Sequence, residues 1–229
     1  MSRHSSYDDL FAEPLDKENA KRNAILLAAA RLFLEQGFEP ISMDAIAAAA
    51  DVSKRTVYSH FQSKSELFAA IMIAHCNSMG GIVLPDPMAD HDPKTVLTDY
   101  GRVFVRMITS RRATALQRVI FREVERFPEV GKIFFQNGPQ RQLTALAAYL
   151  RRADRDGRLS VDDPEGAAYF FLSIVKAPFH LGQLCGLVGD VPEAALRKAV
   201  DKGVAVFLRA YAPAAQRSGK TRKLSSVRA

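Results

Sequence analysis

Residues 42–61, SMDAIAAAADVSKRTVYSHF, decide how the N-terminal part of this chain folds. Apolar side chains recur at helical spacing in two short stretches, one after Ser42 and one after Ser53. A Ser is a favourable N-cap at each of these positions. The stretches are separated by Asp51-Val52-Ser53, which has the length of the turn in a helix-turn-helix. The sequence therefore predicts two short helices joined by a tight turn.

The second of these helices is predicted to carry a polar outer face. Successive residues of a helix are separated by about 100°, so when Val57 and Phe61 point into the core, Arg55 and Ser59 point away from it. The face offers two cations, three hydroxyls and an imidazole, and we expect no acid on it. Such a helix suits the major groove of DNA, where phosphate contacts position it and its donors read base edges. The residues on this face or at its edges are Lys54, Arg55, Thr56, Tyr58, Ser59 and His60.

Helical signals also dominate the rest of the chain, and strand patterns are almost absent. A first helix begins near Glu18 and ends at Gly37, and Ser63 with Glu66 forms a capping box before another helix. Asp-Pro pairs and other Pro residues mark the later helix starts. The expected fold class is all-α. The later helices are predicted at about 93–110, 112–126, 129–137, 139–156, 163–187 and 192–211.

A connecting segment rich in Gly, Pro and Asp, residues 79–92, divides the chain. We expect a disordered N-terminal extension over 1–16, a helix-turn-helix domain over 17–78 and a second helical domain over 79–211. The remainder, 212–229, is expected to be a disordered, solvated basic tail. Much of the net charge of +7 lies in this tail, so the folded part is nearly balanced and the overall charge says little about function.

Composition excludes several classes of protein. The chain has 229 residues, 48% of them hydrophobic, which suffices for a sizeable core and is not typical of a disordered chain. Its two Cys, Cys76 and Cys185, make no disulfide framework and fit a reducing compartment. No apolar run approaches the roughly 20 residues of a membrane span, and the polar, acidic N-terminus does not read as a signal peptide. We therefore expect a soluble cytoplasmic protein that does not enter a membrane.

Metal and catalytic sites are not expected. The stretch Asp90-His91-Asp92 and the pair His75-Cys76 lack four ligands at the spacing of a structural metal site. Cys185 lies near His180 in sequence, but on one helix the two side chains point in different directions. The sequence has no Gly-rich phosphate loop and no pair of carboxylates typical of acid–base catalysis. We expect no metal, no cofactor and no enzymatic activity.

Five short motifs occur at linked spacings between residues 21 and 68. They are Gly37-Phe38, Ser42-x-x-x-Ile46-Ala47, Ala50-Asp51-Val52-Ser53, Tyr58-x-His60-Phe61 and Ser63-Lys64-x-x-Leu67. Together they resemble the pattern of the TetR family of bacterial transcriptional regulators. Asp51 departs from that pattern, which commonly has Gly in the turn, but Asp tolerates left-handed backbone conformations.

The resemblance implies a protein that binds a double-stranded DNA operator. It implies phosphate contacts by Ser42 and Lys64, and contacts of Tyr58 and His60 with the DNA backbone or bases. The alternatives are half-buried packing for Tyr58 and an ordinary surface or capping role for His60. The DNA-contacting residues that the resemblance implies are Ser42, Ser53, Lys54, Arg55, Thr56, Tyr58, His60 and Lys64.

A second set of motifs lies within residues 116–186. They are Phe127-Pro128-Glu129, Leu146-Ala147-x-Tyr149-Leu150, Gly157-x-Leu159, Asp162-Asp163-Pro164 and Ala167-x-x-Phe170. They resemble the C-terminal region of the AefR-like subgroup of the same family. The resemblance implies an effector-binding and dimerisation domain, and it names no ligand.

Aromatic and apolar residues are dense in this second half, which is expected to enclose a pocket for a small, largely apolar effector. Most of these residues serve as core, and core packing is the alternative for each one. The candidate ligand-binding residues are Phe104, Met107, Phe121, Tyr149, Phe171 and His180.

The last two predicted helices carry broad apolar faces. By resemblance, they pair with their equivalents in a second subunit to form a four-helix dimer interface, and burial within one subunit is the alternative. A two-fold symmetric dimer then reads a palindromic operator. The residues of these faces are Ala168, Phe171, Leu172, Val175 and Phe179, followed by Leu196, Val200, Val204, Phe207 and Leu208.

The sequence as a whole indicates a ligand-responsive, homodimeric repressor that binds DNA in a sequence-specific manner. Activation stays open, because it depends on where the operator lies. The alternative is a helical small-molecule-binding or protein-interaction module that no longer binds DNA. The intact cationic face of residues 54–60 argues against that alternative.

Overall fold

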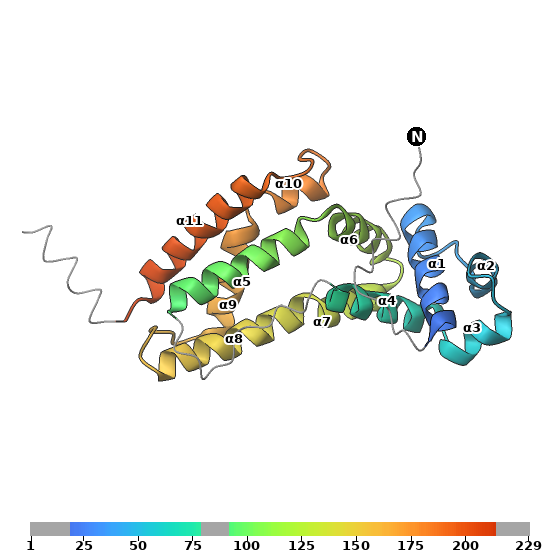
Figure 1. Cartoon of the computed structure of the whole chain (residues 1–229), viewed down its shortest axis with the longest axis horizontal. Coiled ribbons are helices and arrows are strands. Elements are labelled where there is room, and N and C mark those ends of the chain that lie inside the picture. Colours follow the sequence, from blue (N-terminus) through green and yellow to red (C-terminus); the bar gives the residue numbers. More distant parts are fainter. Residues whose placement is uncertain (1–18, 79–91, 214–229) are drawn as a thin grey trace, which may run out of the picture. The chain divides into compact units, whose positions relative to one another are not determined.

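The computed structural model describes residues 19–78 and 92–213, and in these residues the chain forms eleven helices and no strand (Figure 1). This confirms the all-α fold class. The expected N-terminal extension, the connecting segment before Asp92 and the tail after Pro213 lie outside the described residues. The helices are α1 (Ala20–Gln36), α2 (Met43–Ala49), α3 (Lys54–His60), α4 (Lys64–Ser78), α5 (Pro93–Ile108), α6 (Arg111–Glu123), α7 (Pro128–Asn137), α8 (Pro139–Arg155), α9 (Pro164–Lys176), α10 (His180–Leu184) and α11 (Glu193–Tyr211).

The described helices pack into two units. The first contains α1–α4 together with residues 111–141, which include α6 and α7. The second contains α5, α9–α11 and α8 from residue 142 onward. Leu116 and Ile120 of α6 and Val130 of α7 are buried in the same core as α1–α4. The packing therefore differs from the contiguous division expected between residues 78 and 79, because the apolar sides of α6 and α7 complete the N-terminal core.

Four Phe side chains form the centre of the first unit. Phe33, Phe38, Phe61 and Phe68 are each at most 2% exposed. The ring centroid of Phe38 lies 5.3 Å from that of Phe33 and 5.6 Å from that of Phe68, at tilted and edge-on angles that aromatic pairs favour. Because Phe38 belongs to the turn between α1 and α2, these contacts fix the start of α2 against α1 and α4.

Gly37 ends α1, as the sequence predicts. Its φ of 94° and ψ of 175° lie in a region of backbone conformation that is essentially restricted to Gly. A Cβ at this position would lie 2.7 Å from Oε1 of Glu123 and would collide with the Arg122 guanidinium. Gly37 therefore permits both the sharp exit of the chain from α1 and the close approach of the C-terminal end of α6.

Phe171 occupies the centre of the second unit and is fully buried. Its ring centroid lies 6.3 Å from that of Tyr100 on α5 and 5.2 Å from that of Phe207 on α11. A Cβ added at Gly101 would lie 2.9 Å from Cγ1 of Val200, so α5 and α11 approach closely because a Gly stands at this point.

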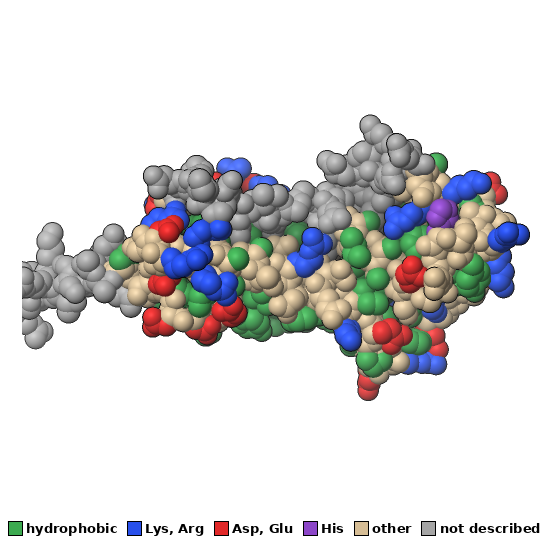
Figure 2. All heavy atoms as spheres, turned by 90° about the horizontal axis from the view of Figure 1, so that it is seen from below, with side chains coloured by type: hydrophobic (Ala, Val, Ile, Leu, Met, Phe, Trp, Pro, Cys, Tyr) green, Lys and Arg blue, Asp and Glu red, His purple; other side chains and the backbone are tan. Residues whose placement is uncertain are grey.

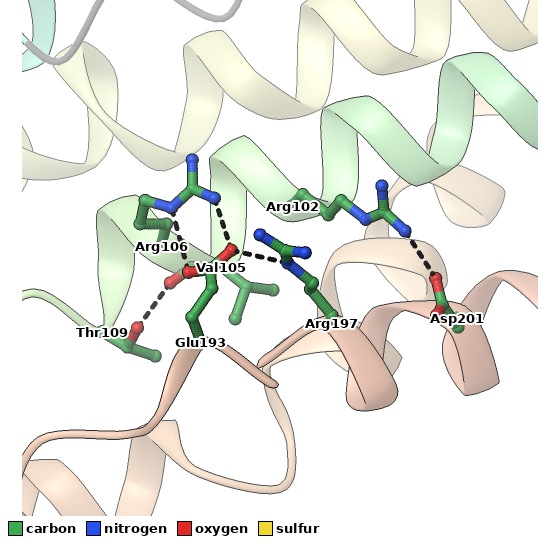
Figure 3. A network of polar contacts seen from close by, with 7 residues as sticks. All are labelled: Arg102, Val105, Arg106, Thr109, Glu193, Arg197 and Asp201. Atoms are coloured by element: carbon green, nitrogen blue, oxygen red, sulfur yellow. Dashed lines mark hydrogen bonds and ion pairs between the residues drawn. The ribbon is translucent and has the colours of Figure 1, made fainter. Parts of the chain in front are cut away.

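Ion pairs line the exposed edge between α5 and α11 (Figure 3). Glu193 accepts from Nη2 of Arg106 at 2.6 Å and from Nε of Arg197 at 3.2 Å, and Arg102 pairs with Asp201 at 3.2 Å. Arg106, followed by Arg197, lowers the pKa of Glu193 to about 2. Exposed ion pairs of this kind add little to stability. They help to align α5 and α11, whereas the packing of the two helices on each other rests on the apolar core.

One predicted helix, 163–187, is wrong. The structure has two helices there, α9 and α10, separated by Ala177, Pro178 and Phe179. Pro178 lacks the backbone N–H that a continuous helix requires, and its ring opposes helical geometry in the preceding turn. The break ends α9 at Lys176, so His180 begins a separate short helix.

Two expected absences concern membranes and metals. Within residues 19–78 and 92–213, no helix combines the length and apolar character needed to cross a bilayer. In the same residues, no three His, Cys, Asp or Glu side chains gather in a way that would hold a metal ion. Asp90, His91 and the side chains of His75 and Cys76, considered above as metal ligands, lie outside the described part of the chain.

Candidate nucleic-acid interface

Two Ser side chains begin the helices of the helix-turn-helix, as the sequence predicts. Oγ of Ser42 accepts from the backbone N–H of Ala45 at 3.0 Å, and Oγ of Ser53 accepts from the N–H of Thr56 at 3.1 Å. Both Ser residues are exposed. Each hydroxyl satisfies one of the unpaired N–H groups at a helix start. The hydroxyl hydrogen of Ser42 still has the capacity to donate to an acceptor outside the protein.

The turn between α2 and α3 depends on Asp51, which has a φ of 52°. Asp is one of the few side chains that adopt this left-handed conformation, so its presence in place of Gly is compatible with the turn. The N–H of Val52 donates to the carbonyl of Ala47 at 3.1 Å. After the turn, Val57 and Phe61 are at most 1% exposed. This confirms the predicted inner face of α3 and directs its opposite face outward.

An acid lies beside the start of α3, which the sequence analysis missed. The Lys54 ammonium lies 2.9 Å from Oδ1 and 3.0 Å from Oδ2 of Asp44, a residue in the first turn of α2. The hydrogen bond to Asp44 is the largest cause that raises the pKa of Lys54, followed by its charge. Asp44 lies ten residues before Lys54, so the helical period of α3 alone does not reveal it.

On the rest of the outer face of α3, some side chains form hydrogen bonds within the protein and others do not. Oγ of Ser53 and Oγ1 of Thr56 share a hydrogen bond of 2.8 Å, and Ser59 donates to the carbonyl of Thr56. Tyr58 is 45% exposed. Arg55 is exposed, and within the described residues no hydrogen bond or ion pair engages its guanidinium. Arg55 and Tyr58 are therefore the two long side chains of α3 that remain available for an outside ligand.

His60 lies at the last turn of α3 and is only partly exposed. Its ring centroid lies 6.4 Å from that of Phe61. In Figure 2, Lys and Arg side chains are the commonest charged groups over the N-terminal helices, and a His lies among them. The described surface over α2, α3 and the turn between them therefore carries the cations Lys54 and Arg55 together with the carboxylates of Asp44 and Asp51.

Lys64 is placed differently from the phosphate contact implied by the sequence. Its ammonium donates to the carbonyls of Phe38, Glu39 and Ile41 at 2.8, 2.9 and 3.0 Å. It also lies 4.5 Å from the centroid of the Phe38 ring. Burial lowers the pKa of Lys64. Because an ammonium has three N–H donors and all three are used, Lys64 fastens the α1–α2 turn to α4 and has no donor left for a phosphate.

The six candidate effector residues are distributed over both units. Phe104 and Phe171 are 6% and 0% exposed and belong to the core of the second unit, because their rings pack against Tyr100. Phe121 belongs to the first unit and is 54% exposed. Met107 on α5 is partly buried against the core of the second unit. Helical periodicity shows that such residues face inward, but it does not distinguish a core from a pocket.

Tyr149 and His180 are polar groups within the second unit. Tyr149 is 4% exposed, and within the described residues its buried hydroxyl has no hydrogen-bond partner. Burial raises the pKa of Tyr149 to about 12. His180 is partly exposed, and burial, followed by the charge of Lys176, lowers its pKa, so the neutral imidazole is favoured. Tyr149 is therefore the candidate with a buried donor that a ligand would satisfy.

The dimer faces named from the sequence are turned inward. Nearly all of their residues are buried in the core of the second unit, including Phe171, Val200 and Phe207 at 0–1% exposure. A different apolar set is left on α9 and α11: Tyr169, Phe170 and Val206 are 61%, 59% and 52% exposed. Helical periodicity predicts the two helices, but the apolar face that it indicates for the dimer contact is the face that packs within the subunit.

Two family models match the chain. The model described as bacterial regulatory proteins of the tetR family matches residues 25–71. The model described as the C-terminal domain of AefR-like transcriptional repressors matches residues 95–213. The first match contains α2, α3 and the turn between them, and the second contains α6–α11 in full.

Solved and curated proteins agree with these matches. The structure of the flavonoid-responsive regulator FrrA has a TM-score of 0.74 and 37% identity, covering 85% of this chain and 98% of that one. The transcriptional activator FasR of Mycolicibacterium smegmatis is 39% identical over 59 residues, which are 26% of this chain and 27% of FasR. The transcriptional regulator AcrR of Shigella flexneri is 33% identical over 132 residues, or 57% of this chain and 60% of AcrR. The chain therefore spans less than two thirds of either curated relative.

Replacing Lys64 tests whether it holds the turn or contacts phosphate. Lys64→Met keeps an apolar stem and removes three charge-assisted hydrogen bonds, so we expect the free energy of unfolding to fall by about 2 kcal/mol. The salt dependence of DNA binding should not change. Lys132→Met, an exposed substitution on α7 of the same unit, is the control and should leave stability unchanged. Unchanged stability of Lys64→Met together with a shallower salt dependence would assign Lys64 to the DNA instead.

Proposed function

Because the chain belongs to the TetR family of bacterial transcriptional regulators, we propose that it is a homodimeric, cytoplasmic repressor that binds a DNA operator through α3. A small, largely apolar effector bound by the second unit would reduce its affinity for DNA. The observation that carries the proposal is the outer face of α3, which presents Arg55 and Tyr58 on a helix whose inner face is locked in the core. Repression is favoured by the description of the AefR-like domain, although FasR is an activator.

The dimensions of α3 suit a DNA groove. An α-helix with its side chains is about 10–12 Å in diameter, and the major groove of B-DNA is about 12 Å wide. An Arg in this position is able to donate two hydrogen bonds to the edge of a guanine, and the Tyr hydroxyl donates or accepts at a base or phosphate. Ser42 at the start of α2 adds a hydroxyl that suits a backbone phosphate.

Dimerisation is supported by the exposed apolar residues of α9 and α11. Tyr169, Phe170 and Val206 are all more than half exposed and lie on two helices that pack against each other, and exposed apolar side chains grouped on one surface favour an interaction site. A second copy of the chain is the natural occupant, because an isologous contact pairs the same face with itself. The resulting two-fold symmetry predicts two half-sites about one helical turn apart, or a multiple of that distance.

The effector proposal rests on Tyr149 and on one relative. The buried hydroxyl of Tyr149 would gain a partner from a ligand with a hydrogen-bond acceptor. FrrA is described as flavonoid-responsive, so flavonoids are the first compounds to test. A ligand shifts the protein away from its DNA-binding conformation only by the difference between its affinities for the two conformations. Coupling between two such sites is typically 1–3 kcal/mol, or about 5- to 150-fold in DNA affinity.

The direct test is a titration of the purified protein with the intergenic DNA beside its own gene. An unrelated duplex of equal length is titrated in parallel, both at two salt concentrations. Tight, salt-sensitive binding to the first duplex alone supports the regulator. Failure to bind either duplex at low salt would favour the module that has lost DNA binding. Equal, weak binding to both would call for selection of a binding sequence from a random pool.

Arg55 is expected to carry base discrimination. Arg55→Ala should weaken operator binding by about 1–3 kcal/mol and relax the preference at one base position of each half-site. Binding to the unrelated duplex should change much less. The measurement is a competition titration against operators carrying single base changes. Arg118→Ala, an exposed substitution on α6, is the control. If Arg55→Ala retains both affinity and base preference, the assignment of α3 as the reading helix fails.

Phe170 is expected to hold the dimer together. Phe170→Glu places charges opposite each other across a two-fold contact, so the protein should sediment as a monomer. Its fold should persist because the side chain is already 59% exposed, and its operator affinity should fall sharply. Phe135→Glu, at a position 48% exposed on α7 of the first unit, should remain dimeric. A dimeric Phe170→Glu variant with parental affinity would exclude this face.

Tyr149 is expected to contact the effector. Tyr149→Phe removes a buried hydroxyl that has no partner among the described residues, so stability should be unchanged or higher. The effector concentration needed to release DNA should rise about 3- to 10-fold, the equivalent of one hydrogen bond. Tyr100→Phe is the matched control, because the Tyr100 hydroxyl donates to Gln142, and its loss should lower stability. A destabilised Tyr149→Phe variant with an unchanged effector response would contradict the assignment.

A further inference from the structure

Asp44 is a carboxylate that directly contacts a cation of the candidate DNA-binding helix. It lies in the first turn of α2, and its side chain and that of Lys54 are each 61% exposed. A negative charge beside a DNA-binding helix repels the phosphate backbone, so its position there requires an explanation other than direct attraction to DNA. The explanation lies in its contact with Lys54.

The contact engages both oxygens of the carboxylate. The Lys54 ammonium lies 2.9 Å from Oδ1 and 3.0 Å from Oδ2, and 6.0 Å from the centroid of the Tyr58 ring. Lys54 is thus held between the start of α2 and the first turns of α3. Its charge is balanced within the protein before DNA arrives. An exposed pair of this kind adds little to stability, so its effect is to be sought in binding.

We propose that Asp44 is a positioning residue that holds the Lys54 ammonium away from phosphates and thereby limits binding to DNA of non-matching sequence. This inference rests on the proposed DNA binding. Phosphate contacts by Lys provide affinity for any sequence. A Lys54 that turned to a phosphate would leave the Asp44 carboxylate unpaired next to the DNA. Non-matching DNA therefore gains little from Lys54, whereas a matching sequence is held by base contacts that Asp44 does not oppose.

Specificity in this arrangement is set by a repulsive element as well as by attractive ones. The relevant quantity is the ratio of affinities for matching and random DNA, which rises when binding to random DNA is suppressed. Removing the carboxylate should free one cation in each subunit for a phosphate. Random DNA should gain more from this change than the matching sequence, so the ratio should fall.

The test uses the full chain and a labelled duplex of random sequence. Asp44→Asn should bind this duplex about threefold more tightly for each subunit at low salt. The slope of log affinity against log salt should steepen by about 0.9 for each subunit. Glu129→Gln is the matched control, because it removes one acid from the first turn of α7 in the same unit, and it should change neither quantity. Asp44→Ser provides a second neutral variant if Asp44→Asn folds poorly.

A second arm asks whether Asp44 acts through Lys54. In a Lys54→Gln background, Asp44→Asn should give a clearly smaller gain in random-DNA affinity. On a duplex selected from a random pool by the parent protein, Asp44→Asn should tighten binding less than on random DNA. Equal gains with and without Lys54, an equal effect of Glu129→Gln, or no gain at all would overturn the proposal. Parent protein that binds no duplex at low salt would overturn the proposed function as well, which separates the two failures.

Discussion

The ammonium of Lys64 is the contact on which the geometry of the first unit depends. It reaches from the start of α4 to three carbonyls of the α1–α2 turn, those of Phe38, Glu39 and Ile41. A turn with three carbonyls pointing toward one another needs a cation or water between them, and Lys64 supplies that cation from within the fold. The direction of α2 is thereby set relative to α1 and α4, and α3 follows α2 after the turn formed by residues 50–53. The second anchor of the same turn is an ion pair between Glu39 and Arg126, which follows α6.

Short helices require such a frame. Helices of seven residues, like α2 and α3, are not stable by themselves in water, because nucleation costs more than so few hydrogen bonds return. Their Ser caps, the left-handed Asp51 and the buried side chains of Val57 and Phe61 hold them in place. The backbone of α3 is therefore held against the core of the first unit, which gives the Cα atom of Arg55 a defined position. The proposed reading of DNA depends on that position, because discrimination between bases requires the Arg side chain to start from a fixed point.

Local signals in the sequence predicted the local structure well. The caps at Ser42 and Ser53, the end of α1 at Gly37, the tolerance of Asp51 for the turn and the inward position of Val57 all follow from residue type and spacing. Pro178 is a local signal as well, because it interrupts the helix predicted over 163–187. The all-α class follows from the same periodicities.

The other differences arise where an outcome depends on contacts between distant residues. Nothing local in the sequence shows that the carbonyl partners of Lys64 lie 23–26 residues earlier, so the resemblance alone implies a phosphate contact for this residue. The contact of Asp44 with Lys54 is not predictable from the period of one helix, because it depends on how α2 packs against α3. Periodicity placed Phe171 and Phe207 on apolar faces, but only the packing of α5, α9 and α11 shows that these faces meet inside one subunit. Phe121, a candidate for the effector pocket, lies on α6, and α6 packs in the first unit. The sequence around Phe121 does not show to which unit α6 belongs.

Amide hydrogen exchange with and without DNA tests the central claim, that α3 held on this frame reads the operator. The full chain is measured alone and in complex with a duplex selected from a random pool, at a salt concentration where random DNA does not compete. We expect slower exchange in residues 42–60 and unchanged exchange in α11, because the proposed dimer contacts of α11 form without DNA. Protection confined to other parts of the chain, with 42–60 unaffected, would contradict the account.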